Sequence, residues 1–452
     1  MAPQKKSINF GFRGWMLILF QAIAFVTYQA ATNYPLNILN GLFNDFAGGG
    51  EGAGQQLLST IYTVAAIIGI IIQLVLANYI GRAKSVKRIS LVLGAVTLIL
   101  LFLMMVLNPM AFTVPWLICY GLVNITSVIY ATFAVGILIG QWFPTRKGTV
   151  MGIATFAFPI ANGLVSIFAG LVFPENAPPD IFGAFLPFFI VFVVGWLIGL
   201  IFVTDYPEQC GAYRDNDKSM TPEIAKAMME QEIENKKTTV WKLAHTLASR
   251  DFWFITIPMG FLLMFSVGTM TQSADIIGQV GLDFGSTMGM IMIFGLVGSY
   301  VLGLLDTRFG TKRSVLIALC IMVIAGIFGA LSSRENPGLL RIALICLALF
   351  MGASSNYTVS AAAQYWRRED FSSVFAVINP VANILASSGP IVVAILFNSA
   401  VGYRLIFIVT AVIAVISILL TLLFSPKHIK ETDDKYRTAA GKPLDDALVG
   451  RK

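Results

Sequence analysis

Charged residues are scarce in this chain. Of its 452 residues only 12% are Asp, Glu, Lys or Arg, whereas 57% are hydrophobic, and a soluble domain normally carries about 25% charged residues. So few charges could not cover a core of this size, so the composition excludes an ordinary soluble protein. Because a bilayer core of about 30 Å requires roughly 20 apolar residues per helix, the chain should contain membrane-spanning helices.

Histidine and cysteine are scarce as well. The two histidines lie in polar segments, and the four cysteines have neither metal-site nor disulfide-framework spacing. No Walker-type phosphate loop occurs, which argues against an ATP-driven pump, and no cluster of His, Asp or Glu within the apolar segments suggests a membrane enzyme. We therefore expect no enzymatic activity, no metal and no cofactor.

Twelve apolar runs are long enough to cross a bilayer as helices. Strands of a membrane barrel would be about 10 residues long and would alternate in polarity, whereas these runs are longer and do not alternate. The sequence therefore predicts an all-α membrane protein. The predicted spans are 14–39, 57–80, 89–107, 112–142, 149–173, 182–204, 252–277, 286–306, 314–332, 339–365, 372–398 and 403–425.

Cations are distributed unevenly around these spans. All but three of the 31 Lys and Arg residues fall in the N-terminal tail, in connections that follow even-numbered spans, or in the C-terminal tail; the exceptions are Arg334, Arg341 and Arg404. By the positive-inside rule both termini should be cytoplasmic. The net charge of +7 follows from this topology and gives no reason to expect nucleic acid as a partner. The short loops favour a bacterial inner membrane.

Two similar stretches lie half a chain apart, QWFPTRKGTVMGIATFAFPIAN and YWRREDFSSVFAVINPVAN. The shared features, each repeated after 221 residues, are Arg146-Lys147, Pro159 and Asn162 in the first and Arg367-Arg368, Pro380 and Asn383 in the second. We predict two related six-helix bundles, 1–205 and 251–426, as in transporters built from parallel repeats. Between them, the linker 206–250 should hold a short amphipathic helix, and residues 427–452 should form a cytoplasmic tail.

Two loop motifs resemble those of the major facilitator superfamily, and the likeness covers essentially the whole chain. The family has an Asp-Arg-x-Gly turn after the second span. The first copy here reads Asn78-Tyr79-Ile80-Gly81-Arg82, with the family's Asp and Arg replaced, and the second reads Asp306-Thr307-Arg308-Phe309-Gly310. The motif Trp142-Phe143-Pro144, with Arg146, Gly148 and Gly152, resembles the turn of oxalate/formate antiporters and monocarboxylate porters.

The resemblance implies two pseudo-symmetric bundles and a latch that holds one conformation. Its residues would be Gly81, Arg82, Asp306, Arg308 and Gly310, with the cations Arg146, Lys147, Arg367 and Arg368. The first, fourth, seventh and tenth spans line the central cavity in this family.

Those same spans carry polar and aromatic residues at membrane depth, where a polar group needs a partner or a wet cavity. For any one of them, hydrogen bonding between helices is the alternative. For Asn162 and Asn383, each one turn beyond a proline, that packing role is the preferred interpretation. The predicted substrate-binding residues are Gln21, Phe25, Tyr28, Thr32, Tyr120, Asn124, Ser127, Gln272, Asn356, Tyr357 and Ser360.

No Arg or Lys lies in the middle of a span, so a small dianion is not the expected cargo. We predict a monomeric secondary transporter that moves a small organic solute, a monocarboxylate or an amphipathic or aromatic organic acid, by alternating access. Asp275, near the outer end of the seventh span, is the candidate for proton coupling, with facilitated diffusion or exchange as the alternatives. Alternative functions are a drug or metabolite efflux antiporter and a transporter-like membrane sensor.

Overall fold

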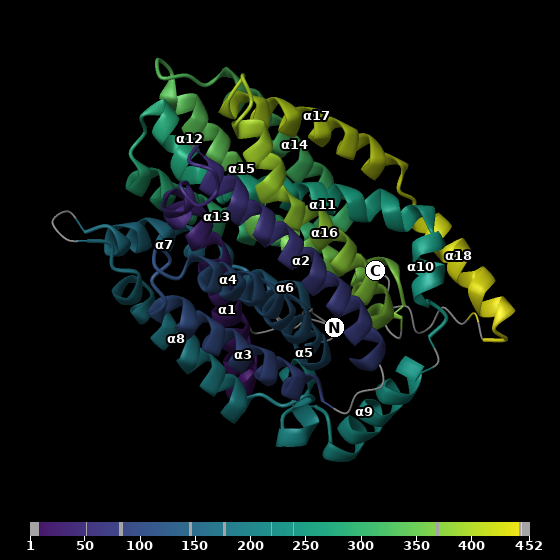
Figure 1. Cartoon of the computed structure of the whole chain (residues 1–452). Helices are drawn as coiled ribbons and strands as arrows, with labels where there is room; N and C mark the ends of the chain where they lie inside the picture. Colours follow the sequence, from purple (N-terminus) through teal and green to yellow (C-terminus); the bar gives the residue numbers. More distant parts are fainter. Residues whose placement is uncertain are drawn as a thin grey trace.

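The computed structural model describes residues 9–50, 52–80, 85–143, 147–174, 178–217, 219–237, 239–367, 370–442 and 444, with side chains except at 77–80, 132–136, 147–149, 231–237 and 372. Helices dominate this part of the chain, and it contains no strand. Twelve helices are long and apolar enough to cross a membrane. The predicted all-α, multi-pass membrane protein is therefore confirmed (Figure 1).

The first six spans form one bundle. Its elements are α1 Gly11–Tyr34, η1 Pro35–Leu39, η2 Asn40–Phe43, α2 Ala53–Ile80, α3 Val86–Val106, α4 Thr113–Val128, η3 Ile129–Ala134, α5 Val135–Trp142, α6 Lys147–Ala154, α7 Ala157–Val172 and α8 Ile181–Phe202. The connecting segment contains η4 Pro207–Cys210, η5 Arg214–Asn216, α9 Pro222–Lys237 and α10 Leu243–Ala248. The helix α9 begins just after Thr221, whose hydroxyl accepts a hydrogen bond from the backbone N–H of Ile224.

The last six spans form the second bundle. Its elements are α11 Arg250–Met270, α12 Ser273–Val280, α13 Phe284–Phe309, α14 Thr311–Leu331, α15 Pro337–Tyr365, α16 Phe371–Phe397 and α17 Tyr403–Leu423, followed by α18 Pro426–Ala439. The predicted tail from 427 therefore begins as a helix. The predicted seventh span, 252–277, is two helices, because the chain leaves the helical path at Gln272 (φ −126°, ψ 19°) before α12 begins.

Two spans of the first bundle are interrupted at membrane depth. The fourth passes through the π-helical segment η3, a geometry that is frequent at functional sites. The fifth breaks between α6 and α7, because Pro159 has no N–H to donate to the carbonyl of Thr155. Asn162 donates its side-chain amide to the carbonyl of Phe158 at 2.9 Å, and not to the carbonyl of Thr155 that Pro159 leaves free. The packing role predicted for this asparagine stays a prediction.

The helix pairs that pack together repeat from one bundle to the other. Contacts between α1 and α7, α2 and α4, and α3 and α8 in the first bundle have counterparts between α11 and α16, α13 and α15, and α14 and α17 in the second. The seam between the bundles is symmetric too, since α2 packs on α16 while α13 packs on α7. These exchanges confirm two pseudo-symmetric bundles, which lie side by side in Figure 1.

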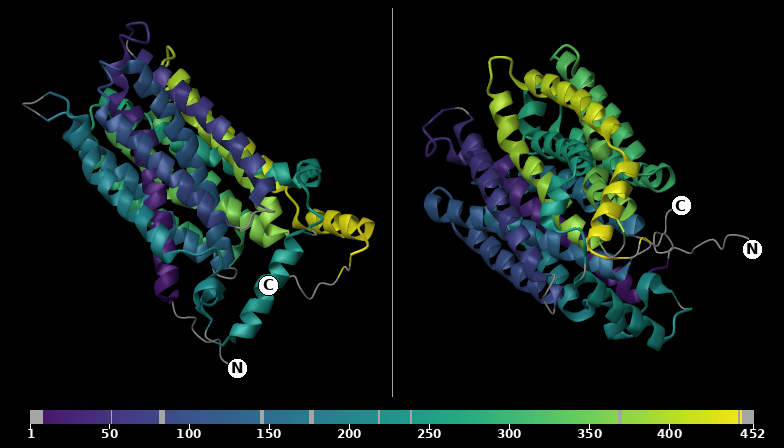
Figure 2. Two further views of the ribbon diagram at one scale, coloured as in Figure 1. Left: turned by 60° about the horizontal axis from the view of Figure 1, so that its bottom comes forward. Right: turned by 90° about the vertical axis from the view of Figure 1, so that its right-hand side faces the viewer.

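The two ends of the molecule differ. The start of α1, the helix α9 and the helix α18 lie together at one end (Figure 2), which we call the linker end; there Asn216 donates to the backbone carbonyl of Asn9 at 3.2 Å. The opposite end holds η1, η2 and α12. At that end Asp283 caps α13 by accepting from the N–H of Ser286 at 2.9 Å, and this bond holds the pKa of the Asp283 carboxyl below its ordinary value.

Candidate functional site

The first, fourth, seventh and tenth spans are the most enclosed helices. In their most apolar stretches 67%, 61%, 72% and 56% of residues are buried, against 22–50% in the other eight spans. Most polar side chains in these stretches are therefore held inside the protein and away from lipid. All of the predicted substrate-binding residues lie on them, or, for Gln272, just beyond the end of α11.

Tyrosines gather between the first, second and fourth spans. The hydroxyls of Tyr28 and Tyr62 share a hydrogen bond of 2.8 Å, and the Tyr120 hydroxyl donates to the backbone carbonyl of Thr32 at 2.9 Å. Tyr120 also stacks on Trp116, with ring centroids 5.7 Å apart. All of these side chains are buried. The structure thus brings Tyr28, Thr32 and Tyr120 together, as predicted for one site.

The four amide side chains predicted for the site share one arrangement. Each donates through its nitrogen: Gln21 to the carbonyl of Ala131, Asn124 to that of Tyr120, Gln272 to that of Pro390, and Asn356 to the hydroxyl of Thr155, at 2.8–3.0 Å.

In each of these amides the side-chain oxygen has no hydrogen-bond partner in the part of the chain described. The four residues are at most 5% exposed. Because buried polar atoms in native proteins are nearly always paired, these acceptors are suited to a donor brought by a ligand.

The other predicted site residues are engaged by neighbouring helices or by their own helix. Phe25 packs on Phe158 of α7, with ring centroids 4.7 Å apart. The hydroxyl of Ser127 bonds the carbonyl of Asn124 within its own helix, and the hydroxyl of Tyr357 bonds Ser314 of α14 at 2.9 Å. Ser360 lies close to the carboxyl of Asp306, at the linker end of α13. The geometry therefore favours packing roles for Tyr357 and Ser360.

The bundles meet directly at the end opposite the linker. Asn37 of η1 donates to the carbonyl of Met270 and accepts from the hydroxyl of Ser273, at 3.0 and 3.2 Å. Asp275 of α12 accepts from the side-chain amide of Gln55 at 2.8 Å and from that of Asn40 at 3.4 Å.

Asp275, predicted as the coupling residue, is therefore part of this seam, which we call the distal seam. It is defined by Asn37, Asn40, Gln55, Ser273 and Asp275.

Close packing joins the bundles at membrane depth. A Cβ added to Gly295 of α13 would lie 2.5 Å from the Cβ of Pro159 of α7, and one added to Gly163 of α7 would lie 2.7 Å from Met292 of α13. Small residues allow helix backbones to approach in this way. Beside them, the bond from Asn356 to Thr155 crosses between the bundles.

The second predicted latch turn is held by the tenth span. Gly310 connects α13 and α14 with φ of +85°, which favours glycine. The next backbone N–H, that of Thr311, donates to the side-chain oxygen of Gln364 at 2.8 Å. Arg308 is exposed, with its guanidinium 5.5 Å from the ring centroid of Phe309. Of the remaining latch residues, Gly81, Arg82, Arg146 and Arg368 lie outside the described residues, as does the side chain of Lys147.

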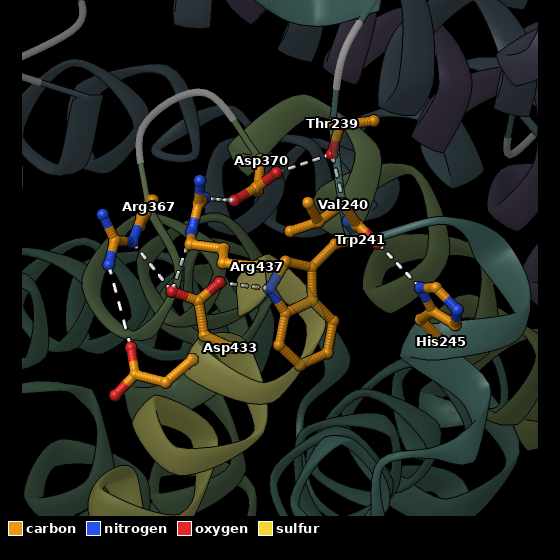
Figure 3. Close-up of polar contacts among 9 residues, drawn as sticks. Thr239, Val240, Trp241, His245, Arg367, Asp370, Asp433 and Arg437 are labelled. Atoms are coloured by element: carbon orange, nitrogen blue, oxygen red, sulfur yellow. Dashed lines mark hydrogen bonds and ion pairs between the residues drawn. The ribbon is translucent and has the colours of Figure 1, made fainter. Parts of the chain in front are cut away.

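Arg367 joins a buried charge network at the linker end (Figure 3). Its Nε contacts the Asp433 carboxylate of α18 at 2.7 Å, and the same carboxylate accepts from Arg437 at 3.1 Å. Arg437 also pairs with Asp370, next to the start of α16, at 2.6 Å. The network therefore fastens α18 to the connection between the tenth and eleventh spans.

The same network holds the end of the linker. Thr239 donates to Asp370 at 2.6 Å, and the indole of Trp241 donates to Asp433 at 2.9 Å (Figure 3). Trp241 is fully buried and packs edge-on against Trp366 and Tyr436. The linker from Thr239 onward thus belongs structurally to the second bundle.

The sequence interpretation missed several of these residues. Tyr62 was overlooked because the second span was not expected to line the centre. Asp433 and Arg437 were assigned to a polar tail, although their spacing from Ile429, at i, i+4 and i+8, is typical of one helix face. Thr155 carries no sequence signal apart from its place four residues before Pro159.

The superfamily model of major facilitator transporters matches residues 22–305 and 279–449, and no curated protein matches. Among solved structures, the chain resembles the proton:xylose symporter XylE bound to 6-bromo-6-deoxy-D-glucose, with TM-score 0.67, 13% identity and coverage of 90% of this chain and 94% of that one. It also resembles the human organic anion transporter MFSD10 (TETRAN), with TM-score 0.63, 12% identity and coverage of 93% of this chain and 100% of that one. A third similar structure is the major facilitator transporter FucP in the outward conformation, with TM-score 0.61, 11% identity and coverage of 90% of this chain and 98% of that one.

At these identities the structural likenesses describe the fold alone, whereas the sequence model covers nearly the whole chain. The protein belongs to the major facilitator superfamily of membrane transporters.

Proposed function

We propose that the cargo of this secondary transporter is a monocarboxylic acid, or another organic acid with an apolar or aromatic part, and that it binds in its uncharged, protonated form. The site would lie between the tyrosines and amides of the central spans. Phe25, Tyr28 and Tyr120 offer aromatic surface, while Gln21, Asn124, Gln272 and Asn356 offer acceptors.

The observation that carries the proposal is the set of four unpartnered amide oxygens. An acceptor needs a donor, and a carboxylate would bring further acceptors into a region with no Arg or Lys at mid-span. Burying an unpaired charge there would be costly. A protonated acid instead supplies one O–H donor, which can pair with one of these oxygens, and that hydrogen bond contributes about 1 kcal/mol.

Binding the protonated acid would also couple transport to protons. Each cargo molecule would enter with one proton and release it on the less acidic side, so the proton gradient would drive accumulation. In this scheme Asp275 carries a second proton: its protonation loosens the distal seam, so accumulation of the cargo depends on both protons. The two bundles would rock about the central site in alternating access.

The proposed topology places the linker end in the cytoplasm of a bacterial cell, with the protein in the inner membrane. It rests on the charge bias, since 28 of the 31 Lys and Arg fall at that end of the predicted topology. Single cysteines at Ser219 and Asn398, in a chain whose native cysteines are replaced, test it. A membrane-impermeant maleimide should label Asn398→Cys in intact cells and Ser219→Cys only after lysis; the reverse pattern contradicts the topology.

Three probes of one shape test the charge state of the cargo. They are 3-phenylpropionic acid, its amide and its methyl ester, added to purified protein in thermal unfolding experiments. A ligand at 100 times its Kd stabilises by about 2.7 kcal/mol. Because a simple carboxyl titrates near pH 4, the acid should stabilise at about pH 5 and fail at about pH 8. The amide should stabilise at both, and the ester at neither.

Equal stabilisation by the acid at both pH values would overturn binding in protonated form. The site itself is tested in proteoliposomes by replacing Tyr28, Asn124 and Asn356 together with Ala, which should abolish uptake of the acid. Thr60→Ala is the control, because the Thr60 hydroxyl is exposed and bonds only its own helix. Uptake that survives the triple replacement would remove the site, and binding without any flux would indicate a sensor.

A further inference from the structure

A hollow of about 460 Å³ opens at the end of the second bundle opposite the linker. It is lined by Ala330, Leu331, Ser333, Arg334, Glu335 and Arg404. These residues come from the end of α14, the loop before α15 and the first turn of α17. The hollow lies outside the central spans, so it is separate from the proposed transport site.

Both arginines are oriented by backbone carbonyls. The Nε of Arg404 donates to the carbonyl of Ser332 at 3.0 Å, and the Nε of Arg334 donates to that of Gln279 at 2.9 Å. Tyr403 fixes the Ser332 carbonyl further by donating to it at 2.8 Å. Each guanidinium is thereby anchored by one edge, while its remaining N–H groups stay available for an anion.

Neither guanidinium is in an ion pair with a carboxylate of the described chain, although Glu335 lines the same hollow. Arg341, the third cation predicted for this side, differs because its charge acts on the Asp283 carboxylate. Two arginines and one acid, all three exposed and none of them in an ion pair within the described residues, thus line one hollow. The first turn of α17 adds the positive end of a helix dipole.

Apolar side chains are exposed on the helices that carry the hollow. Leu331, which lines the hollow, is 64% exposed, and Ile327 of α14 and Ile408 of α17 are exposed on the same two helices. These two helices pack on each other at the edge of the bundle, and their exposed faces meet lipid. A ligand that fills the hollow can therefore continue as acyl chains along the same helices.

We propose that this hollow binds the phosphoethanolamine headgroup of a membrane lipid. The phosphodiester lies between Arg334 and Arg404, which suit phosphate by fork-like hydrogen bonding. The ammonium group lies at Glu335 and donates to its carboxylate. On the proposed topology this site faces the outer leaflet, and it accounts for two of the three cations that run against the charge bias.

Native mass spectrometry of the detergent-purified chain tests the site with three lipids of identical acyl chains: phosphatidylethanolamine, phosphatidylcholine and phosphatidylglycerol. The wild type should retain phosphatidylethanolamine most strongly, because only its headgroup has both a phosphate and a donating ammonium. Replacing Arg334 and Arg404 together with Gln should lower that retention about tenfold, since one charged hydrogen bond contributes at least this factor.

Glu335→Gln should remove the preference for phosphatidylethanolamine over phosphatidylcholine and leave phosphate binding in place. Lys226→Gln, which removes an exposed cation on α9, is the matched control and should change nothing. If the double Gln variant unfolds at a lower temperature than the wild type, the variant with Lys in place of both arginines is used instead. Lysine keeps the positive charge but cannot form the paired, fork-like hydrogen bonds of a guanidinium.

Two results would overturn the proposal. One is equal retention of all three lipids by the wild type and the arginine variant. The other is stabilisation of the chain by inorganic phosphate, dependent on both arginines, without lipid retention, which would assign the hollow to a soluble anion. Neither result bears on the transport site, so failure here is distinguishable from failure of the proposed function.

Discussion

At the scale of single residues, Asp275 is tied to the opposite bundle by two amides. Its carboxylate accepts from Gln55 at 2.8 Å and from Asn40 at 3.4 Å. A carboxylate accepts these bonds better than a carboxylic acid does, so protonation should loosen the seam. The side chain of Asp275 would then take part both in proton coupling and in closure of the distal end.

Asp275→Asn removes the charge and the titration while keeping the shape. We expect gradient-driven accumulation of the cargo to fall by at least tenfold, with cargo exchange across the membrane retained. Gln55→Ala is the companion variant: it weakens the seam and leaves the acid free to titrate, so accumulation should persist at a reduced rate. Uptake and exchange are measured in proteoliposomes for each variant. Unchanged accumulation in Asp275→Asn would show that Asp275 has no role in proton coupling.

Residue identity was partly predictable from sequence. Gln21, Asn124 and Asn356 were recognisable because amides are conspicuous in apolar spans. Their partners were not, since Ala131 and Tyr120 contribute only backbone carbonyls, and Thr155 lies 201 residues from Asn356. Which amide oxygen remains unpaired depends on these contacts. The presence of free acceptors in the site could therefore not be predicted from the sequence and is seen only in the structure.

At the scale of elements, the close approach of α7 and α13 depends on glycine. Gly295→Ala would place a Cβ 2.5 Å from the Cβ of Pro159, a rigid ring that cannot move aside. Overpacking of this kind costs about 1–3 kcal/mol, so the thermal unfolding temperature in detergent should fall and transport should slow. Gly289→Ala on the same helix is the control, because nothing lies within 4 Å of its added Cβ. Equal effects of the two variants would contradict the packing argument.

The helix α18 is held by buried charges rather than by apolar contact alone. Asp433→Asn leaves Arg367 and Arg437 buried with less compensation, and breaking such a pair costs about 3–5 kcal/mol. We expect α18 to detach, which limited proteolysis after Lys427 or Lys435 would detect. Asp434→Asn is the neighbouring control, since that carboxylate is 37% exposed and 3.9 Å from Arg367. It should cost at most about 1 kcal/mol, and similar cleavage of both variants would argue against the network.

Elements followed from sequence wherever length and hydrophobicity decided them, which is why all twelve spans were found. The interruptions did not follow. The π-helical segment from Ile129 to Ala134 has no proline or glycine to mark it. The end of α11 at Met270 is followed by the polar residues Thr271, Gln272 and Ser273, which the predicted seventh span included. Helix α18 was hidden because its apolar face is a single isoleucine, Ile429, and its other buried positions are charged.

At the scale of the whole molecule, the connecting segment divides between the bundles. Asp205 accepts from the hydroxyl of Ser85 at 2.6 Å and so stays with the first bundle, whereas Thr239 and Trp241 bond into the second. The helix α9 therefore connects the two bundles. Rocking of the bundles would therefore be absorbed at the ends of α9 and at the distal seam.

If the bundles rock, the distal seam must open in each transport cycle. A disulfide between Asn37→Cys and Ser273→Cys, whose native side chains are 3.2 Å apart across the seam, should hold it shut. In a chain with its native cysteines replaced, oxidation should abolish uptake into proteoliposomes and reduction should restore it.

The control pair is Thr97→Cys with Thr126→Cys, whose hydroxyls are 2.9 Å apart within the first bundle. Because that cross-link joins two helices of one rigid body, it should leave uptake intact. Loss of uptake in the control would mean that the bundles deform rather than rock. Full cross-linking of Asn37→Cys to Ser273→Cys with uptake unchanged would mean that the cargo passes without opening the seam, and would rule out alternating access about it.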